Sequence, residues 1–404
     1  MIREALQALR VAERPVLIYG AGIRLADAVD EARELVHLLG IPVALTWGAR
    51  DLFPAGDPLC VGGFGTHGTR AANFAVQNAD WILAVGSRLD SKATGMPRKN
   101  FARAAAVFMA DIDLAEVRKF GGQLGRVFVG VQADAKLILR TAINEVRSSE
   151  QLWFEERRCI ALSLWCMQCA EWRERYLVCP PAYEAEERVN PYVFARHLSA
   201  RCNPGEVIIS DTGLSLAWMM QAFEFKENQR FIHALNQTPM GYGLPAAIGA
   251  AYARPGKRVI LVSGDGGFML NIQELAVVAH HKLPIKMILF NNDGHAMCRQ
   301  TQEQWLGGKY YSTSIAGGLS FPNFSAVAAA HGVVSKRLSL AKDVPEALKW
   351  TLADDDRPVL LEVKIAGSHR LIPQVPYGRP NEDGNPPLPR DELAAQMIVG
   401  MVGG

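Results

Sequence analysis

The sequence has no apolar run that reaches the roughly 20 residues a membrane-spanning helix needs. Its first residues, Met-Ile-Arg-Glu-Ala-Leu, include charged side chains and lack the apolar core of a signal peptide. A net charge of +2 leaves no basic excess for neutralising phosphates. The sequence therefore predicts a cytoplasmic protein that binds neither a membrane nor nucleic acid.

The cysteine pattern of a disulfide-linked secreted protein is also missing. The seven cysteines are an odd number without a secretory signal, so we expect free thiols. Cys166 and Cys169 have the spacing of half a zinc site, but no second CxxC or HxxxH follows. Their segment is typical of a Trp-rich amphipathic helix. We therefore interpret these thiols as packing residues, with zinc binding as the alternative.

What the chain does have is enough apolar sequence for two domains. Hydrophobic residues make up 49% of its 404 residues and charged residues 21%, as in globular proteins. Short apolar runs alternate with helical segments, which indicates an α/β fold with two doubly wound, mainly parallel sheets. The expected parts are a first domain over residues 1–146, a linker over 147–189, a second domain over 190–367, and a tail over 368–404.

The expected strands are apolar runs that end at glycine or at a polar turn. In the first domain they lie within residues 14–24 and at 42–46, 81–85, 105–110 and 127–131. In the second domain they lie at 206–210, 258–263, 285–290 and 358–363. Helices are expected at 26–39, 243–253, 273–281 and 324–331. The Pro- and Gly-rich tail is expected to run over the surface or over the site.

Two strand ends in the second domain carry residues that suit a phosphate and a cation. Gly264-Asp265-Gly266-Gly267 follows one apolar strand, and Asn291-Asn292 follows the next. Open α/β sheets bind ligands at the carboxyl ends of neighbouring parallel strands. Glycines let the backbone approach a diphosphate, and the following helix offers unpaired N–H groups. Asp265 and Asn292 supply oxygen ligands for Mg²⁺, and the carbonyl of Gly294 is a candidate third ligand.

Either motif alone is typical of a turn, but together they resemble a known signature. GDGGFMLNIQELAVVAHHKLPIKMILFNND is similar to the thiamin-diphosphate (ThDP) binding signature, and closely so to the acetohydroxyacid synthase (acetolactate synthase) large-subunit family. The similarity extends to SDTG, to MGYGLPAAIGAA, and to GTHGTRAANFAVQNADWILAVGSRLDSKATG in the first domain. It implies a central Rossmann-like domain over 1–146 and a ThDP diphosphate-binding domain over 190–367.

The resemblance also implies roles for individual residues. Asp265 and Asn292 would bind Mg²⁺ through their side chains, and Gly294 through its carbonyl. Met240 matches a bulky apolar residue that holds the cofactor in a bent shape, with a core methionine as the alternative. His295 is the candidate acid or base, or else a turn residue without a catalytic role. The residues expected to contact ThDP are Thr212, Gly213, Leu214, Ser215, Met240, Gly264, Gly266, Gly267, His295 and Ala296.

Members of this family usually have a pyrimidine-binding domain as well. That domain carries the glutamate that hydrogen-bonds the aminopyrimidine, and no segment of this sequence resembles it. We therefore expect the activating glutamate on a separate subunit, with a truncated sequence as the alternative. The expected assembly is a homodimer of this chain within a heterotetramer. It would require an apolar surface on residues 190–365.

The substrate region departs from the family pattern. Thr301 stands where the branched-chain synthases carry a Trp, and Leu214 and Ser215 stand where Gln and His are usual. These changes put the usual acetolactate product in doubt. A reactive thiol at Cys298 is an alternative to a pocket-lining role. The candidates for lining a different pocket are Met297, Cys298, Gln300 and Gln304.

A second cofactor, FAD, has a structural role in the central domain of acetohydroxyacid synthases. Many relatives keep the fold without a flavin, and Gly20-Ala21-Gly22 alone is a weak dinucleotide signal. Both alternatives therefore stay open for this chain. The residues that match the flavin contacts of the family are Gly65, His67, Gly68, Gly86, Arg88 and Asp111.

The leading hypothesis is a subunit of a ThDP- and Mg²⁺-dependent carboligase. It would decarboxylate a small 2-oxo acid and transfer the acyl group to an acceptor. The alternatives are a simple decarboxylase or lyase and a non-catalytic ThDP-binding regulatory subunit. The presence of both Asp265 and Asn292 favours a working metal site. A nicotinamide dehydrogenase is disfavoured, because no convincing GxGxxG precedes an acidic residue by about 20 positions.

Overall fold

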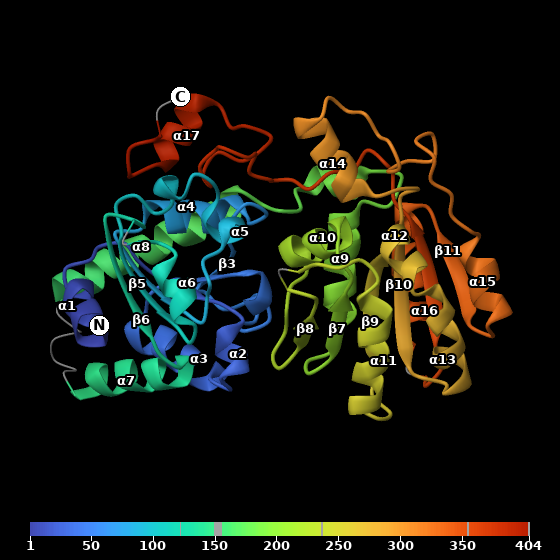
Figure 1. The fold of residues 1–404 in the computed structure, drawn as a ribbon, viewed down its shortest axis with the longest axis horizontal. Helices are drawn as coiled ribbons and strands as arrows, with labels where there is room; N and C mark the ends of the chain where they lie inside the picture. Colours follow the sequence, from blue (N-terminus) through green and yellow to red (C-terminus); the bar gives the residue numbers. More distant parts are fainter. Residues whose placement is uncertain (122, 149–155, 236, 354, 403–404) are drawn as a thin grey trace. The chain divides into compact units, whose positions relative to one another are not determined.

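A computed structural model describes residues 1–121, 123–148, 156–235, 237–353 and 355–402 (Figure 1). The chain forms two compact units. Unit 1 comprises Met1–Leu177 with Ile372–Gly404, and unit 2 comprises Val178–Leu371. Each unit contains one six-stranded sheet. The prediction of two α/β domains with parallel sheets is therefore confirmed.

The sheet of unit 1 has the strand order β3-β2-β1-β4-β5-β6, and its described pairings are all parallel. In a doubly wound sheet of this order, the direction of winding changes between β1 and β4. Strands PVLIY and WILAV are buried along their whole length, because helices cover both faces. The strands are β1 (Pro15–Tyr19), β2 (Val43–Leu45), β3 (Cys60–Gly63), β4 (Trp81–Val85), β5 (Ala106–Asp111) and β6 (Val127–Gln132).

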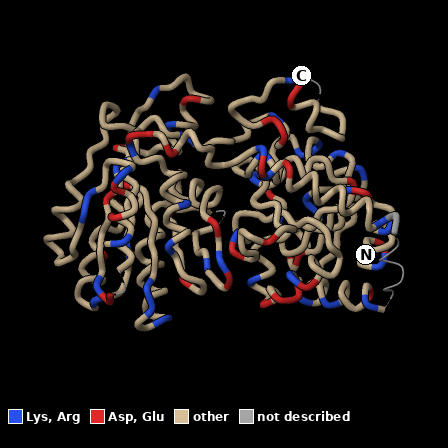
Figure 2. The backbone as a smooth tube through the Cα atoms, turned by 180° about the vertical axis from the view of Figure 1, so that it is seen from behind, with Lys and Arg blue, Asp and Glu red and all other residues tan. Residues whose placement is uncertain are grey.

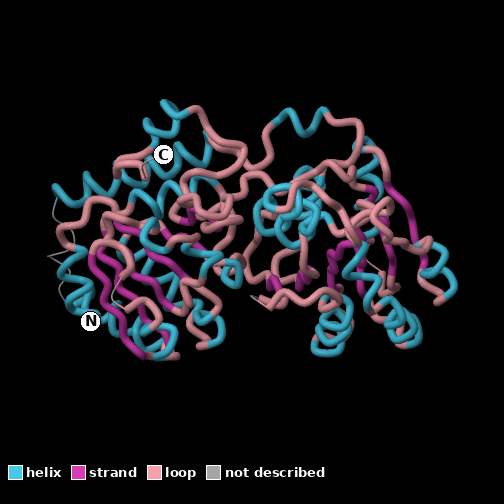
Figure 3. The backbone as a smooth tube through the Cα atoms, turned by 45° about the horizontal axis from the view of Figure 1, so that its top comes forward, coloured by secondary structure: helices cyan, strands magenta, loops and turns pink. Residues whose placement is uncertain are grey.

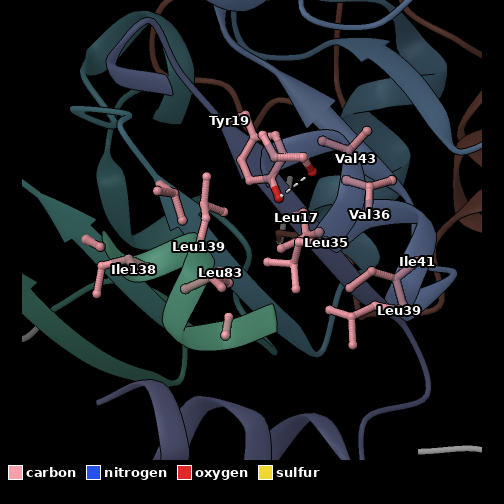
Figure 4. Packing of buried hydrophobic residues seen from close by; sticks show 14 of the residues in the cluster. Leu17, Tyr19, Leu35, Val36, Leu39, Ile41, Val43, Leu83, Ile138 and Leu139 are labelled. Atoms are coloured by element: carbon pink, nitrogen blue, oxygen red, sulfur yellow. Dashed lines mark hydrogen bonds between the residues drawn. The ribbon is translucent and has the colours of Figure 1, made fainter. Parts of the chain in front are cut away.

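Helices pack on both faces of this sheet (Figure 3). Because successive side chains of a strand point to opposite faces, β1 directs Leu17 and Tyr19 into one layer and Ile18 into the other. Figure 4 shows Tyr19 in the first layer, where its hydroxyl donates to the carbonyl oxygen of Ala32 at 3.2 Å. Helices on that face are α1 (Ile2–Leu9), α3 (Val29–Leu39) and α7 (Ala135–Ser148). The helices on the other face are α4 (Arg70–Asn78), α8 (Glu156–Arg175) and α17 (Arg390–Gln396). Three short helices follow directly after strands: α2 (Gly22–Leu25), α5 (Ser91–Thr94) and α6 (Leu114–Arg118).

Parts of the expected linker and tail supply core residues to unit 1. Trp165 of α8 donates from Nε1 to the carbonyl oxygen of Pro15 at 3.0 Å. Trp172 of the same helix donates to Oε1 of Gln396 at 2.9 Å, and Leu393 is buried in the same layer. Residues 156–177 and 372–402 therefore belong to the packed body of unit 1. Their aromatic and aliphatic side chains require burial, which a free linker or tail would not provide.

One of the three cysteines of α8, Cys169, takes part in this packing, whereas Cys166 is partly buried and Cys159 is exposed. Cys169 is buried beside Trp165 and Trp172, and all seven cysteines are free thiols. Across the described part of the chain, no group of three or more His, Cys, Asp or Glu side chains is arranged to hold a metal ion. These findings agree with packing as the role of the thiols.

The sheet of unit 2 has the order β11-β12-β10-β9-β7-β8, again with parallel pairings throughout the described strands. From β7, the chain adds β8 on one side and β9, β10, β11 and β12 on the other. The direction of winding therefore changes between β7 and β9. The strands are β7 (Val207–Ser210), β8 (Arg230–Ile232), β9 (Val259–Gly264), β10 (Ile285–Asn291), β11 (Val334–Leu338) and β12 (Val359–Lys364).

The helices of unit 2 also form two layers. One layer contains Leu261 and Met287 and lies under α11 (Gly243–Ala253), α12 (Asp265–Leu270), α13 (Leu275–His280) and α15 (Phe324–Ala330). In the other layer, Phe290 of β10 packs against Phe194 and Trp218, with ring centroids 5.4 and 6.1 Å away. The helices there are α9 (Pro191–Arg201), α10 (Leu214–Ala222) and α16 (Val344–Thr351), while α14 (Ala296–Trp305) follows β10.

Some expected bounds match the structure and others differ. Residues 81–85 and 243–253 form β4 and α11 as predicted. The expected helix 26–39 begins later than predicted, at Val29, because Asp27 has a positive φ of 50° that a helix does not accommodate. The edge strands β3, β8 and β11 were not predicted, since each is short or has exposed positions and lacks a continuous apolar run.

Charged residues of both signs are interspersed along the two units (Figure 2). This distribution is consistent with the small net charge of +2. Within the residues that the structure describes, no helix combines the length and the apolar composition needed to cross a bilayer.

Candidate cofactor site

Three neighbouring strands of unit 2 end close together at their carboxyl ends. The register pairs Phe290 of β10 with Gly264 of β9, and Ser210 of β7 with Val262 of β9. The polar residues that follow these strands therefore emerge at one edge of the sheet. This edge includes the point where the winding changes direction, which is where open α/β sheets bind ligands.

Asp265 connects two of the strand ends. Its carboxylate is buried and accepts hydrogen bonds from the amides of Gly266 (2.7 Å), Asn292 (3.0 Å) and Gly294 (3.1 Å). Burial raises the pKa of Asp265 to about 6, and the three amides oppose that rise. A cation bound to this carboxylate would also favour its charged form.

The two asparagines after β10 have different partners. Asn291 donates from Nδ2 to Oε1 of Glu362 at 2.7 Å and accepts from the amide of Asp293 at 3.1 Å. It therefore ties β10 to β12. Asn292 accepts at Oδ1 from Nη2 of Arg299 at 2.9 Å. One lone pair of the Asn292 oxygen remains for another partner.

The residues after Asn292 are held in a defined loop. The amide of His295 donates to the carbonyl oxygen of Thr313 at 3.0 Å, and the amide of Ala296 donates to that of Gly294 at 3.1 Å. A Cβ at position 294 would lie only 2.4 Å from the Thr313 carbonyl oxygen. Glycine is therefore required at position 294 for this close approach.

Asp211 is a buried residue that we did not predict for the site. It follows β7 and accepts from the amides of Thr212 (2.7 Å) and Gly241 (3.2 Å) and from Oγ of Ser263 (3.3 Å). Burial raises its pKa, and its hydrogen bonds oppose the rise. The available signal was an acidic residue directly after the apolar run VIIS, the same pattern that identified Asp265.

The loop after β7 has a backbone that only glycine adopts readily. Gly213 has φ of 100° at the start of α10, and a Cβ there would meet no atom within 4 Å. Leu214 is buried, and Ser215 directs its hydroxyl to the carbonyl oxygens of Asp211 and Thr212 at 3.4 and 3.3 Å. The Ser215 hydroxyl therefore donates to the backbone of its own loop.

Two of the expected cofactor residues, Met240 and His295, lie against Gly266. A Cβ at position 266 would lie 2.3 Å from Nδ1 of His295 and 3.0 Å from Cε of Met240. Gly264 lies beside Ser215: a Cβ at position 264 would be 3.8 Å from Oγ of Ser215. Burial and the nearby Arg299 charge lower the pKa of His295. The strand ends thus bring the expected residues into one neighbourhood.

The donor set fits magnesium bound together with a diphosphate. It consists of the Asp265 carboxylate, the Asn292 amide oxygen and the Gly294 carbonyl oxygen. Mg²⁺ typically takes one or two carboxylates and completes its shell with phosphate oxygens and water. A Cβ at Gly213 would meet no atom within 4 Å, and one at Gly264 would meet only Oγ of Ser215, so both glycines leave room beside the backbone for such an anion.

The expected substrate residues follow on α14. Thr301 donates to the carbonyl oxygen of Met297 at 3.1 Å, and Cys298 is exposed. Gln300 is buried and exchanges two hydrogen bonds with the backbone of Leu371, at 2.9 and 3.2 Å. These bonds give Gln300 a structural role in connecting α14 to the segment after β12.

The candidate flavin residues lie in unit 1. Cβ atoms at Gly65, Gly68 and Gly86 would lie 2.3, 2.5 and 2.8 Å from backbone atoms of Lys92, Phe64 and Gly22. Close packing between loops of unit 1 therefore already requires these glycines.

The other three flavin candidates also have partners within unit 1. His67 lies edge-on to Trp47 with centroids 5.1 Å apart, and burial lowers its pKa to about 4, with a further contribution from Lys92. Arg88 pairs with Glu116 at 2.7 Å. Asp111 accepts from the amide of Asp113 at 2.9 Å, and burial raises its pKa.

Comparison with known proteins assigns the two halves of the chain. Residues 2–142 match the family described as thiamine pyrophosphate enzyme, central domain. Residues 211–363 match the family described as thiamine pyrophosphate enzyme, C-terminal TPP binding domain. The second match contains the residues of the candidate site, from Asp211 after β7 to the loop after β10.

The chain is also similar to several acetolactate synthase large subunits. It is 32% identical over 383 residues to the isozyme 2 large subunit of Escherichia coli, covering 95% of this chain and 65% of the relative. It is 32% identical over 380 residues to that of Lactococcus lactis, covering 93% and 62%. A probable large subunit of Methanococcus aeolicus is 30% identical, covering 93% and 62%. The chain thus spans slightly less than two thirds of the length of these relatives.

Proposed function

The chain contains the central and C-terminal domains of the thiamine pyrophosphate enzyme family, and we propose that it binds ThDP with Mg²⁺ at the strand ends of unit 2. The observation that carries this proposal is the network around Asp265. A single buried carboxylate holds the amides of Asn292 and Gly294 on the neighbouring strand end. This carboxylate thereby holds the residues of the three proposed metal ligands close together.

The residues of this chain would bind and orient the cofactor. Asp265, Asn292 and Gly294 would hold Mg²⁺, and the backbone at Gly213 and Gly266 would lie against the diphosphate. Met240 and His295 both adjoin Gly266, which supports a position beside the cofactor for both side chains. When bound, ThDP supplies the nucleophile and electron sink for decarboxylating a 2-oxo acid.

We further propose an acetolactate-synthase-like carboligase that acts on a small 2-oxo acid. Similarity to the acetolactate synthase large subunits supports this reaction class. The replacement residues Thr301, Leu214 and Ser215 leave the acceptor undefined. A simple decarboxylase would release an aldehyde without joining two substrates, and a regulatory subunit would bind ThDP without turnover.

A pyrimidine-binding domain with the activating glutamate is the proposed partner of this chain. Unit 2 exposes apolar side chains next to the candidate site, with Met240 38% and Leu270 56% exposed. Leu270 adjoins Gly241: the Cβ of Leu270 lies 3.0 Å from the position that a Cβ at residue 241 would take. Exposed apolar side chains in one area are typical of an interaction surface. We propose that two copies of this chain assemble with two partner subunits.

Calorimetric titration with ThDP and Mg²⁺ tests cofactor binding. We expect Asp265→Asn to weaken binding at least about tenfold, because a neutral side chain loses the charge that attracts Mg²⁺. Asp293→Asn is a matched control, since Asp293 lies in the same loop but pairs with Lys364 at 2.8 Å. Wild-type protein that binds no ThDP, or equal affinities in the two variants, would contradict the proposal.

Turnover assays separate the alternative functions. The chain is incubated with pyruvate, ThDP and Mg²⁺, with and without a pyrimidine-binding domain, and the products are identified by mass spectrometry. We expect carboligation products only when the domain is added. Robust turnover by this chain alone would reject the partner requirement, while free acetaldehyde would identify a decarboxylase. Binding without turnover in either mixture would identify a regulatory subunit.

For unit 1, we propose a fold that does not depend on FAD. The glycines that match flavin contacts pack against backbone atoms of unit 1 itself, so their presence has a structural reason. A visible absorption spectrum of the purified protein tests this proposal. Flavin bands in the folded protein, together with loss of its circular-dichroism signal when the flavin is removed, would contradict it.

A further inference from the structure

Arg299 lies against the proposed metal-binding loop. It is on α14 and is only 9% exposed. Its Nη2 donates to both oxygens of Asn292, to Oδ1 at 2.9 Å and to the carbonyl oxygen at 3.2 Å. Its Cζ lies 3.3 Å from the position that a Cβ at Gly294 would take. One guanidinium therefore contacts two of the three proposed ligand residues.

The charge of Arg299 is not neutralised by the nearest acid on its own helix. Glu303 is engaged by Arg370 and by the hydroxyl of Tyr310, which donates to it at 2.7 Å. The Nε of Arg299 is buried and has no hydrogen-bond partner among the described residues. A buried cation with an unused donor is costly unless an anionic group lies nearby. Asp265 is one such group, and a bound diphosphate would be another.

The contact with Asn292 restricts the orientation of the amide group. An asparagine carboxamide can present either its oxygen or its NH₂ group to a ligand, whereas a guanidinium has only donors. The contact at 2.9 Å therefore holds the Asn292 oxygen on the side of Arg299. The second lone pair of that oxygen remains available to a cation.

We propose that Arg299 is a positioning residue for the metal centre. By holding both oxygens of Asn292, it keeps an oxygen rather than an amide nitrogen available to the divalent cation. The inference rests on the proposed function, because it assumes that Asn292 binds the metal that accompanies ThDP. Arg299 itself would not bind the cation; it would act through Asn292, which is one of the three proposed metal ligands.

Cation selectivity provides a test that general loss of structure would not mimic. Mg²⁺ requires nearly ideal octahedral geometry, whereas Ca²⁺ tolerates variable arrangements. A misoriented Asn292 should therefore weaken Mg²⁺ binding more than Ca²⁺ binding. Changes to groups that orient a ligand typically lower metal affinity about 10–100-fold.

The experiment uses the full chain with saturating ThDP and titrates each cation by calorimetry. We expect Arg299→Met to weaken Mg²⁺ binding about 10–100-fold and to weaken Ca²⁺ binding less. Arg299→Lys keeps a donor on a shorter side chain and should recover part of the Mg²⁺ affinity. Arg254→Met is the matched control, because Arg254 is exposed and donates to Gly205 at 2.8 Å at the far end of α11.

The outcomes distinguish this inference from the proposed function. Wild-type protein that fails to bind ThDP with either cation would reject the proposed function itself. If wild type binds but Arg299→Met binds Mg²⁺ equally or more tightly, or loses both cations to the same extent, the inference is overturned. Circular dichroism checks folding. If Arg299→Met does not fold, the Mg²⁺-to-Ca²⁺ affinity ratio of Arg299→Lys decides, and an unchanged ratio rejects the positioning role.

Discussion

The Asp211 carboxylate occupies the space that a side chain at position 267 would need. Its Oδ2 lies 2.7 Å from the position of a Cβ at Gly267. The same carboxylate holds the amides of Thr212 and Gly241. One buried acid therefore joins the loop after β7, the start of α12 and the segment before α11. The proposed diphosphate site depends on this junction.

Gly267→Ala should disrupt the junction. The added methyl group would displace Asp211 and its two amide partners, so we expect ThDP to bind roughly tenfold more weakly in the presence of Mg²⁺. Calorimetric titration measures the change. Gly249→Ala is the matched control, because a Cβ at position 249 meets nothing within 4 Å and alanine favours helix. Equal affinities in the two variants would show that the junction does not support binding.

Removal of divalent cations should weaken ThDP binding. Without a divalent cation, the diphosphate would approach the buried Asp265 carboxylate with no metal ion between the two anions. We expect the affinity measured in EDTA to be at least about tenfold lower than in Mg²⁺, and to recover when excess Mg²⁺ is added. The quenching of tryptophan fluorescence during titration provides the measurement. Unchanged binding in EDTA would argue against a metal-bridged diphosphate.

Stability should depend on pH through His67. Burial lowers its pKa to about 4 in the folded chain, against about 6.5 for an unfolded histidine. Between these values the unfolded state binds the extra proton, so the free energy of unfolding should fall as the pH falls from about 6.5 to about 4. The effect should be on the order of 1–3 kcal/mol. Urea unfolding of wild type and His67→Gln at several pH values tests this, and parallel pH profiles would refute it.

Replacing Asp355 should lower the free energy of unfolding more than replacing Lys286, although the two residues form one ion pair. Lys286 is completely buried, and its Nζ lies 2.7 Å from Oδ1 of Asp355, which is one third exposed. Asp355→Ala leaves a buried ammonium without its counter-charge and should cost about 2–3 kcal/mol. Lys286→Met replaces the charge with an apolar chain of similar length and should cost less.

Urea unfolding of the Lys286→Met and Asp355→Ala chains measures both costs, with the Lys364–Asp293 pair as a reference. Lys364→Met removes a lysine from an exposed pair and should change stability by under about 1 kcal/mol. A larger loss in Lys286→Met than in Asp355→Ala would contradict the expected order.

Much of the candidate site was predictable because its residues follow recognisable strands. Asp265 and Asn292 come directly after buried apolar runs, and parallel strands place their ends at one edge of a sheet. Asp211 has the same position after β7 and was missed, because its role depends on contacts with Gly241 and Gly267 rather than on a local motif. Arg299 was missed because its helix brings it back onto the loop that precedes it.

The short apolar runs and their glycine ends were sufficient to predict two α/β domains and to place Asp265 and Asn292 at one edge of a sheet, because strand burial and backbone freedom are local properties of the chain. Which polar groups meet was decided only by the tertiary structure. Strand order brings Asn291 to Glu362, 71 residues away, and brings the Asp211 carboxylate against Gly267. Such contacts depend on register and on the direction of each side chain, which a pattern of residue types does not specify.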